Sequence, residues 1–251
     1  MAMQENQNQV EREEKKMSSM SVKKKALIAL CALVGVVAIV VTSVLGTVAY
    51  LTSSAAVSNV FTIGNVGITM DESKVNPDGT VVEGAARVDT NTYHLMPGKT
   101  YKKDPTVHVN EGSEKSYLFV LVRNDISGIA DNEKDTIADQ LAANGWAKYT
   151  PASTGWIYVY VGADNVPSGD AGKTSGTNDT LVASLVTAGH YKLFDSFSID
   201  PDAKIDTYGA AKITLTAVAI QGEGISSIAT AWAAVVETYP YIHTGGAPSG
   251  T

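Results

Sequence analysis

Residues Ser116–Asn124 have the sequence SYLFVLVRN, an apolar run of aromatic, β-branched and leucine side chains with no charge before Arg123. A run of this length and composition is typical of a β-strand. The segment Tyr101–Val109 is also expected to be extended, and Glu111-Gly112-Ser113 supplies turn residues between the two. We therefore predict that these two segments form a strand pair.

Further strands are predicted on both sides of this pair. Gly155–Gly162, GWIYVYVG, alternates aromatic and aliphatic residues, as a half-buried strand does. The other apolar, β-branched segments are Val57–Met70, Leu193–Ile199 and Lys212–Gln221. Turns are expected at Asn76-Pro77-Asp78-Gly79, within a hairpin over residues 71–84, and at Pro97-Gly98.

Two short helices are expected among the strands. Asp131–Ala143 places Ile137 and Leu141 four residues apart, and the acids Asp131, Glu133 and Asp135 would occupy its first turn. Ser226–Val236 brings Ile228, Trp232 and Val235 to one side and ends before Pro240. Many short strands with few helices predict an all-β fold, a β-sandwich of one domain over residues 50–243. Residues 162–179 are expected to form a surface loop, and residues 244–251 a flexible tail.

Composition excludes several classes of protein. The 251 residues are 44% hydrophobic and 18% charged, which suits a globular chain and excludes collagen-like or wholly disordered ones. The one cysteine, Cys31, excludes a disulfide-stapled fold. Residues 50–251 carry a formal charge of −9, so they offer no basic stripe, and nucleic acid is not an expected partner.

The N-terminal region is predicted to direct export. Residues 1–22 are polar and would form a cytoplasmic extension, whereas Lys23, Lys24 and Lys25 precede an uncharged run, Ala26–Leu51. As a helix this run would span about 39 Å at ~1.5 Å per residue, enough to cross a membrane once. Small residues in Thr47-Val48-Ala49 predict signal-peptide cleavage between Ala49 and Tyr50, which makes residues 23–49 the signal peptide. Retention of the segment as an anchor is the alternative.

The residues that follow the predicted signal peptide contain little evidence of a catalytic motif. Pro167 stands where a P-loop ending at Gly172-Lys173-Thr174 needs glycine, and no G-x-S-x-G or G-x-G-x-x-G occurs. The four histidines are His94, His108, His190 and His243, and none has a histidine partner four residues away, as a zincin helix requires. His94 and His108 fall near predicted strands and could meet in space. We nominate no catalytic residue, no metal ligand and no cofactor.

The aromatic residues Trp146, Trp156, Tyr158 and Tyr160 allow two interpretations. Trp156, Tyr158 and Tyr160 share one face of their strand, because they are two residues apart. That face could stack against a sugar, but core or subunit interface is the favoured interpretation.

Several segments together resemble one family of exported proteins. Gly46–Glu72, GTVAYLTSSAAVSNVFTIGNVGITMDE, is similar to the start of proteins processed by the SipW-type signal peptidase of Gram-positive bacteria. Met96–Val122 contains the pattern PG-x-x-x-x-K-D-P-x-V, and residues 193–200 and 213–233 resemble the closing strands and final helix of the same family. The family is that of TasA and camelysin.

This resemblance implies a jelly-roll-like β-sandwich at the cell surface that builds biofilm-matrix fibres, with a dedicated signal peptidase and copies of itself as partners. It also implies cleavage near Ala49, so that the protein would contact the membrane only through its signal segment. Because camelysin-type relatives have been classed as metallopeptidases, a surface metallopeptidase is an alternative, and a surface-displayed binding module is another.

The candidate assembly strand lies within Val57–Met70, where the run is too apolar to stay in solvent. Phe61 and Ile63 alternate on one face, and Val66 and Ile68 continue the period of two on the far side of Gly64. Gly64 is therefore expected to mark a bulge or crossing point. The segment should either pair within its own sheet or be donated to the next subunit.

Overall fold

The computed structural model describes residues 52–56, 58–168, 177–205, 211–240 and 242, and for residues 52–63 it describes the backbone. The chain divides into two units, Met1–Ala49 and Tyr50–Thr251, and every described residue belongs to the second. The predicted signal peptide, its cleavage point at Ala49 and Tyr50, and the tail after residue 243 lie outside the described residues. No helix in the described part is long and apolar enough to cross a membrane.

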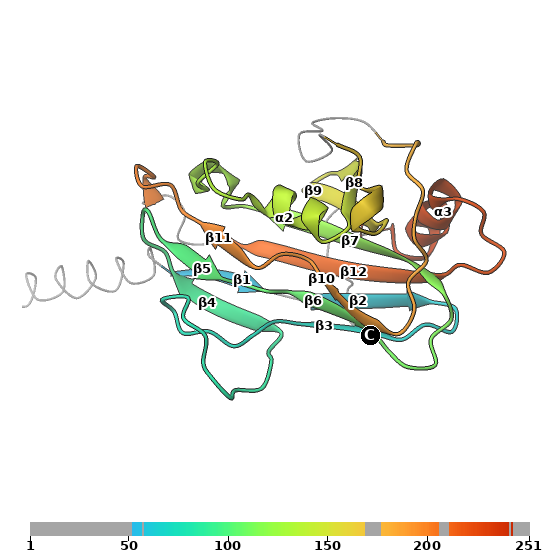
Figure 1. Ribbon diagram of the computed structural model, residues 1–251, viewed down its shortest axis with the longest axis horizontal. Helices are drawn as coiled ribbons and strands as arrows, with labels where there is room; N and C mark the ends of the chain where they lie inside the picture. Colours follow the sequence, from blue (N-terminus) through green and yellow to red (C-terminus); the bar gives the residue numbers. More distant parts are fainter. Residues whose placement is uncertain (1–51, 57, 169–176, 206–210, 241, 243–251) are drawn as a thin grey trace, which may run out of the picture. The chain divides into compact units, whose positions relative to one another are not determined.

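Antiparallel β-strands dominate the described residues, with two short α-helices and two 3₁₀ turns (Figure 1). The strands are β1 (Thr52–Ala56), β2 (Ser58–Ile63), β3 (Ile68–Asp71), β4 (Thr90–His94), β5 (Thr100–Lys102), β6 (Thr106–Val109), β7 (Ser116–Asn124), β8 (Trp146–Ala152), β9 (Gly155–Tyr160), β10 (Gly189–Lys192), β11 (Ser196–Ser198) and β12 (Ile213–Gln221). The helical elements are η1 (Ser127–Ile129), α2 (Ile137–Ala143), η2 (Ala163–Asn165) and α3 (Ile228–Thr238). The prediction of an all-β protein with two short helices is confirmed.

The largest sheet has five strands in the order β2-β12-β7-β9-β8. Its centre is the antiparallel pair of β7 and β12, which runs in register from Ile213 opposite Asn124 to Gln221 opposite Ser116. β2 pairs with β12 in parallel and forms one edge of the sheet. β8 forms the other edge.

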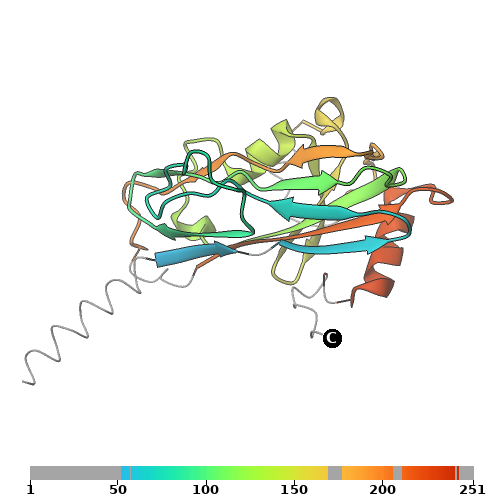
Figure 2. The ribbon, with the colours of Figure 1, turned by 90° about the horizontal axis from the view of Figure 1, so that it is seen from below.

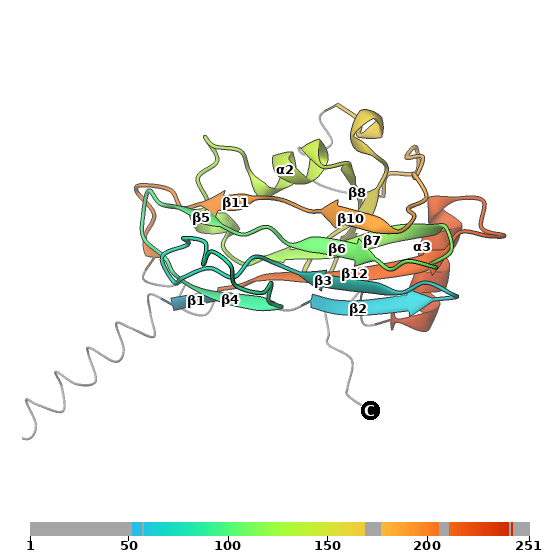
Figure 3. The ribbon, with the colours of Figure 1, turned by 60° about the horizontal axis from the view of Figure 1, so that its bottom comes forward.

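Three smaller sheets form a second layer over one face of the large sheet, with strand orders β10-β6-β3, β1-β4 and β11-β5 (Figure 3). Apolar side chains of both layers meet in one core. Val107 and Val109 of β6 contribute to it from the second layer, and Leu118, Val120 and Val122 of β7 contribute from the large sheet. Two apolar layers therefore enclose the main core.

The opposite face of the large sheet is buried too. Tyr117, Phe119 and Leu121 of β7 point away from the main core, into a second cluster that includes Trp232 and Val235 of α3. β7 is consequently covered on both faces, and this is why its sequence is continuously apolar rather than alternating.

The predicted pairing of Tyr101–Val109 with Ser116–Asn124 is wrong. β6 pairs with β3 and β10, whereas β7 pairs with β12 and β9, so the turn at residues 111–113 crosses between layers. The backbone N–H of Asn110 donates to Gly67 O, and Ser116 exchanges backbone bonds with Val186. Turn residues between two strands mark a reversal of the chain, but they do not specify which partner each strand finds.

The expectation for Gly64 is confirmed. The predicted segment Val57–Met70 is two strands, β2 in the large sheet and β3 in the second layer, with Gly64 at the transition at a φ of 87°. A side chain at this position would adopt an unfavourable backbone conformation and meet Gln221, whose Oε1 lies 2.6 Å from an ideal Cβ. Val66, Ile68 and Met70 beyond it are buried in the main core.

The two helices differ in how well they match the sequence pattern. α3 begins after its N-cap Ser227 and buries Ile228, Trp232 and Val235, as predicted. α2 is shorter than predicted because Thr136 forms a capping box with Asp139, which starts the helix at Ile137. Asp131, Glu133 and Asp135 therefore precede the helix and do not occupy its first turn, which corrects that expectation.

The predicted turns at Asn76–Gly79 and Pro97-Gly98 are present. Gly79 N–H donates to Asn76 O, and Lys99 N–H donates to Met96 O. Four strands, β1, β4, β8 and β10, were not predicted from the sequence. Residues 169–176 of the predicted surface loop lie outside the described residues.

Candidate functional site

A lysine, a glutamate and an asparagine meet in the interior of the second layer. Lys103 Nζ lies 2.5 Å from Glu72 Oε2, and Asn91 Nδ2 donates to Glu72 Oε1 at 3.0 Å. The three residues are 3%, 2% and 6% exposed. We call Glu72, Asn91 and Lys103 the buried triad.

Three separate elements position the buried triad. Glu72 directly follows β3, and its backbone N–H and C=O bond with Val88. Asn91 is an inward-facing residue of β4, on the same side as buried Tyr93. Lys103 directly follows β5, and its backbone N–H donates to Asp195 O. The triad therefore connects segments next to β3, β4 and β5, which belong to three different sheets.

The side-chain amide of Asn91 has a partner for each of its polar atoms. The backbone N–H of Val75 donates to Oδ1 at 2.9 Å, and Nδ2 donates to Ser73 O at 2.9 Å in addition to Glu72. An N–H donor at Oδ1 and a C=O acceptor at Nδ2 fix the orientation of the amide. The amide plane thus presents its nitrogen edge to the carboxylate.

Burial dominates the electrostatics of the buried triad. It lowers the pKa of Lys103, against the attraction of Glu72 and Asp104, because the interior solvates an ammonium poorly. It also raises the pKa of Tyr93, which the nearby negative charges of Glu72 and Asp104 raise further. The rings of Tyr93, Tyr101 and Phe197 are buried in the same layer and pack together at centroid distances of 5.2 to 5.8 Å.

A second polar group, centred on Arg87, lies beside the buried triad. Its guanidinium contacts Asp71 Oδ1 through Nε at 2.5 Å and Asp104 Oδ2 through Nη1 at 3.4 Å. Asp104 also accepts from Ser73, through the backbone N–H at 2.7 Å and the hydroxyl at 2.8 Å. Burial would raise the pKa of Asp104, but the bonds from Ser73 and the charge of Arg87 hold it below its ordinary value.

Two histidines face each other across β6 and β10. His108 and His190 are directly opposed in the antiparallel register, and their Nδ1 atoms lie 2.6 Å apart. His108 Nε2 lies 2.8 Å from Asp71 Oδ1, so one carboxylate contacts both His108 and Arg87. His94 lies instead on β4, opposite Thr52 of β1. His108 therefore pairs with His190 rather than with His94, the partner that the sequence suggested.

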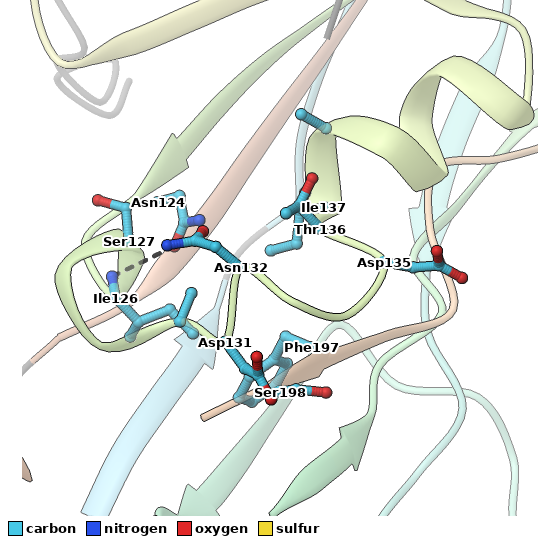
Figure 4. A pocket seen from close by; sticks show the side chains of 12 residues that line it. Asn124, Ile126, Ser127, Asp131, Asn132, Asp135, Thr136, Ile137, Phe197 and Ser198 are labelled. Atoms are coloured by element: carbon cyan, nitrogen blue, oxygen red, sulfur yellow. Dashed lines mark hydrogen bonds between the residues drawn. The ribbon is translucent and has the colours of Figure 1, made fainter. Parts of the chain in front are cut away.

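Two further features of the described residues were considered, potential metal-binding side chains and a small pocket. No group of three or more His, Cys, Asp or Glu side chains there could hold a metal ion. A pocket of about 280 Å³ lies at the N-terminal end of α2 and is lined by Asp131, Asn132 and Asp135 among others (Figure 4). The Asp131 carboxylate is engaged by the Glu133 N–H and by Lys134.

The four aromatic residues lie in the main core or pack against it, which confirms the core alternative of the favoured interpretation. Trp146 and Tyr158 are buried in the main core, and Trp156 and Tyr160 pack against it while half-buried. Of the candidate assembly residues, Val66 and Ile68 are core residues after Gly64, and Phe61 and Ile63 lie in β2.

The buried triad was not predicted from the sequence. Its only sequence signal is the motif that contains Lys103-Asp104-Pro105, in which a lysine and an aspartate stand beside a strand of apolar residues. Asn91 and Glu72 lie in a polar stretch whose contacts become apparent only in three dimensions.

Comparison with known proteins gives no relative: no family model, no curated protein and no solved structure matches this chain.

Proposed function

We propose that this protein is an exported structural protein of the cell surface or biofilm matrix, and that copies assemble into fibres by donating the N-terminal segment. The proposal includes a jelly-roll-like arrangement of the two layers. Cleavage by a dedicated signal peptidase between Ala49 and Tyr50 would release this segment just before β1 begins at Thr52.

The position of β1 and β2 carries the proposal. Figures 2 and 3 show the two strands following one another along one border of the second unit. In its sheet each is bonded to one neighbour, β1 to β4 and β2 to β12. Residues 50–64 contain no charged side chain, which suits a strand that must enter an apolar edge.

Strand addition exploits backbone hydrogen bonds, which are the same whether the strand comes from its own chain or from another. If β1 and β2 leave their own unit, the edges of β4 and β12 become an acceptor for the same segment of a second copy. Such a contact is head-to-tail, so it extends into a filament unless the rotation closes a ring.

Deletion of residues 50–64 from the mature chain tests the proposal. The truncated protein should stay monomeric at concentrations at which the mature protein polymerises, and it should still cap growing ends. Sedimentation velocity and electron microscopy measure both effects. A mature protein that stays monomeric at high concentration and over a range of pH would contradict strand donation.

A peptide with the sequence of residues 50–64 provides a sharper control. It should bind the truncated protein and fill the β12 edge. The same peptide carrying Val60→Pro should bind far more weakly, because proline removes a backbone N–H in the segment paired with β12. Equal binding of the two peptides would show that the strand is not recognised through its backbone.

Release is tested separately from assembly. Replacing Ala49 by a bulky residue should hold the protein in the membrane, since signal peptidases require a small residue there. N-terminal sequencing of the extracellular protein should give Tyr50 for the wild type. Normal release of the substituted protein would place the cleavage site elsewhere.

A further inference from the structure

We propose that Lys103 and Asn91 become joined by an intramolecular isopeptide bond, with Glu72 as the acid–base group. This inference is independent of strand donation, because it concerns only residues inside one unit. It assigns the buried triad a covalent self-modification, in which the lysine amine replaces the amide nitrogen of asparagine.

Geometry brings the three groups to one carboxylate. Lys103 Nζ is at Glu72 Oε2 and Asn91 Nδ2 is at Glu72 Oε1, so the nucleophile and the leaving group face the same acid–base residue. All three residues are at most 6% exposed. Exclusion of water matters because water would compete with the amine for the carbonyl carbon and would weaken each electrostatic contact.

Burial prepares the nucleophile. An ammonium has no lone pair, so Lys103 must lose a proton before it can attack. Desolvation lowers the pKa of Lys103, and Glu72 Oε2 is placed to accept the proton. Lysine in an apolar environment is a recognised nucleophile for this reason.

The surroundings of Asn91 prepare the electrophile. Val75 N–H donates to Oδ1 at 2.9 Å, where negative charge develops when the carbonyl carbon becomes tetrahedral. Ser73 O and Glu72 Oε1 hold the two hydrogens of Nδ2, which keeps the leaving nitrogen next to a proton donor once Glu72 is protonated.

The step balances without an oxidant or a co-reactant. Glu72 takes one proton from the Lys103 ammonium, and the neutral Nζ forms a bond to Cγ of Asn91. Glu72 then delivers that proton to Nδ2 and accepts a second proton from the attacking nitrogen. The Cγ–Nδ2 bond breaks, ammonia leaves, and the products are a secondary amide and a neutral Glu72.

The product removes an unfavourable feature of the fold. Before reaction the interior holds an ammonium and a carboxylate, whose desolvation is costly. After reaction no charge remains in the buried triad. The bond also closes a loop over residues 91–103 and attaches β4 to the segment that follows β5, so β4 cannot separate from the second layer.

Mass spectrometry of the full chain tests the inference. The wild-type protein should be lighter than its sequence by the mass of one ammonia molecule, and a digest should contain a branched peptide that joins Asn91 to Lys103. Lys103→Arg and Glu72→Gln should each restore the sequence mass. Lys102→Arg is the matched control and should keep the ammonia loss, because Lys102 is half-exposed and pairs with Asp195.

Two results would overturn the inference. The first is a folded wild-type protein with the full sequence mass and no branched peptide, and this measurement does not depend on whether any variant folds. The second is an ammonia loss that persists in Lys103→Arg, because cyclisation of Asn91 onto its own backbone would then explain it.

Discussion

Ser73 connects the two polar groups of the second layer, since its carbonyl accepts from Asn91 and its N–H and hydroxyl donate to Asp104. Arg87 Nη1 donates to the same hydroxyl at 3.1 Å. A single side chain thus holds the carboxylate of Asp104 in place while its backbone orients the amide of Asn91. Changing the hydroxyl should therefore alter the titration of Asp104 with little effect on Asn91.

Ser73→Ala should lower the free energy of unfolding by about 1 kcal/mol at neutral pH, the ordinary value of a lost hydrogen bond. The pKa of Asp104 is held below its ordinary value in the folded state, so its contribution is present above that ordinary value and is lost as pH falls through the folded one. The difference between wild type and Ser73→Ala should therefore shrink as the pH falls below about 4. Chemical denaturation at several pH values measures it.

Ser113→Ala is the matched control for this titration. The Ser113 hydroxyl bonds with the backbone of Gly67, accepting from its N–H at 3.1 Å and donating to its carbonyl oxygen at 3.3 Å. Its loss should cost a similar free energy that does not change between pH 7 and pH 3. A pH-independent cost for Ser73→Ala as well would contradict the role given to Asp104.

Gly79 and Gly112 separate the cost of backbone strain from the cost of a steric clash. Both have a φ of 81°. A Cβ at Gly79 would lie 2.7 Å from the Tyr101 ring and 3.0 Å from Tyr101 Cα, whereas a Cβ at Gly112 would meet nothing within 4 Å. Each alanine should cost roughly 1 kcal/mol for the positive φ.

Gly79→Ala should therefore be the more destabilising of the two, by an additional amount of about 1–3 kcal/mol for overpacking against Tyr101. Thermal and chemical unfolding of the two variants give the comparison. Equal losses would show that the turn around Gly79 moves away from Tyr101 without cost.

At the scale of elements, α3 stabilises the large sheet from the side opposite the second layer. Trp232 packs against Phe119 of β7 and Tyr149 of β8, with ring centroids 5.3 and 6.3 Å away. Trp232→Ala should reduce the free energy of unfolding by about 3–5 kcal/mol, as large-to-small changes in a core do. Urea denaturation followed by far-UV circular dichroism measures this loss.

The exposed face of α3 provides the control for this change. Ala233, next to Trp232 in sequence, is exposed, so Ala233→Ser should change stability by no more than about 0.5 kcal/mol. A small effect of Trp232→Ala would mean that the packing of α3 on the sheet contributes little to the free energy of unfolding, and that the second cluster is not a cooperative part of the fold.

The strands with a continuous or alternating apolar pattern could be predicted from the sequence, and those without it could not. β7, β9 and β12 lie at or next to the centre of the large sheet, where burial imposes the pattern. β4 has the sequence TNTYH, and β10 has GHYK. Each alternates buried or half-buried with exposed residues over four or five positions, too short and too polar a stretch to distinguish from a loop.

Pairing and the buried triad depend on contacts that are distant in sequence. Nothing local distinguishes β6 as a partner of β3 from β6 as a partner of β7, since both arrangements bury its valines. Glu72, Asn91 and Lys103 are polar residues in polar surroundings of the sequence. Only the fold shows that they are buried and bonded to one another.

At the scale of the whole molecule, the net charge would oppose the proposed strand donation. Residues 50–251 carry a formal charge of −9, so two approaching copies repel. The proposed donor segment, residues 50–64, contributes none of that charge. Assembly should therefore be limited by repulsion between the acidic bodies and driven by a neutral strand.

Raising the salt concentration should consequently promote assembly of the mature protein. The Debye length falls from about 30 Å at 0.01 M to about 10 Å at 0.1 M salt, which screens repulsion between bodies but leaves backbone pairing unchanged. Light scattering should rise sooner and at lower protein concentration as salt is added. The variant that lacks residues 50–64 has the same net charge, so it experiences the same screening and should remain monomeric throughout. If the truncated protein also self-associates when salt is added, the attraction lies elsewhere on the acidic body. If neither protein responds to salt, electrostatic repulsion does not limit assembly.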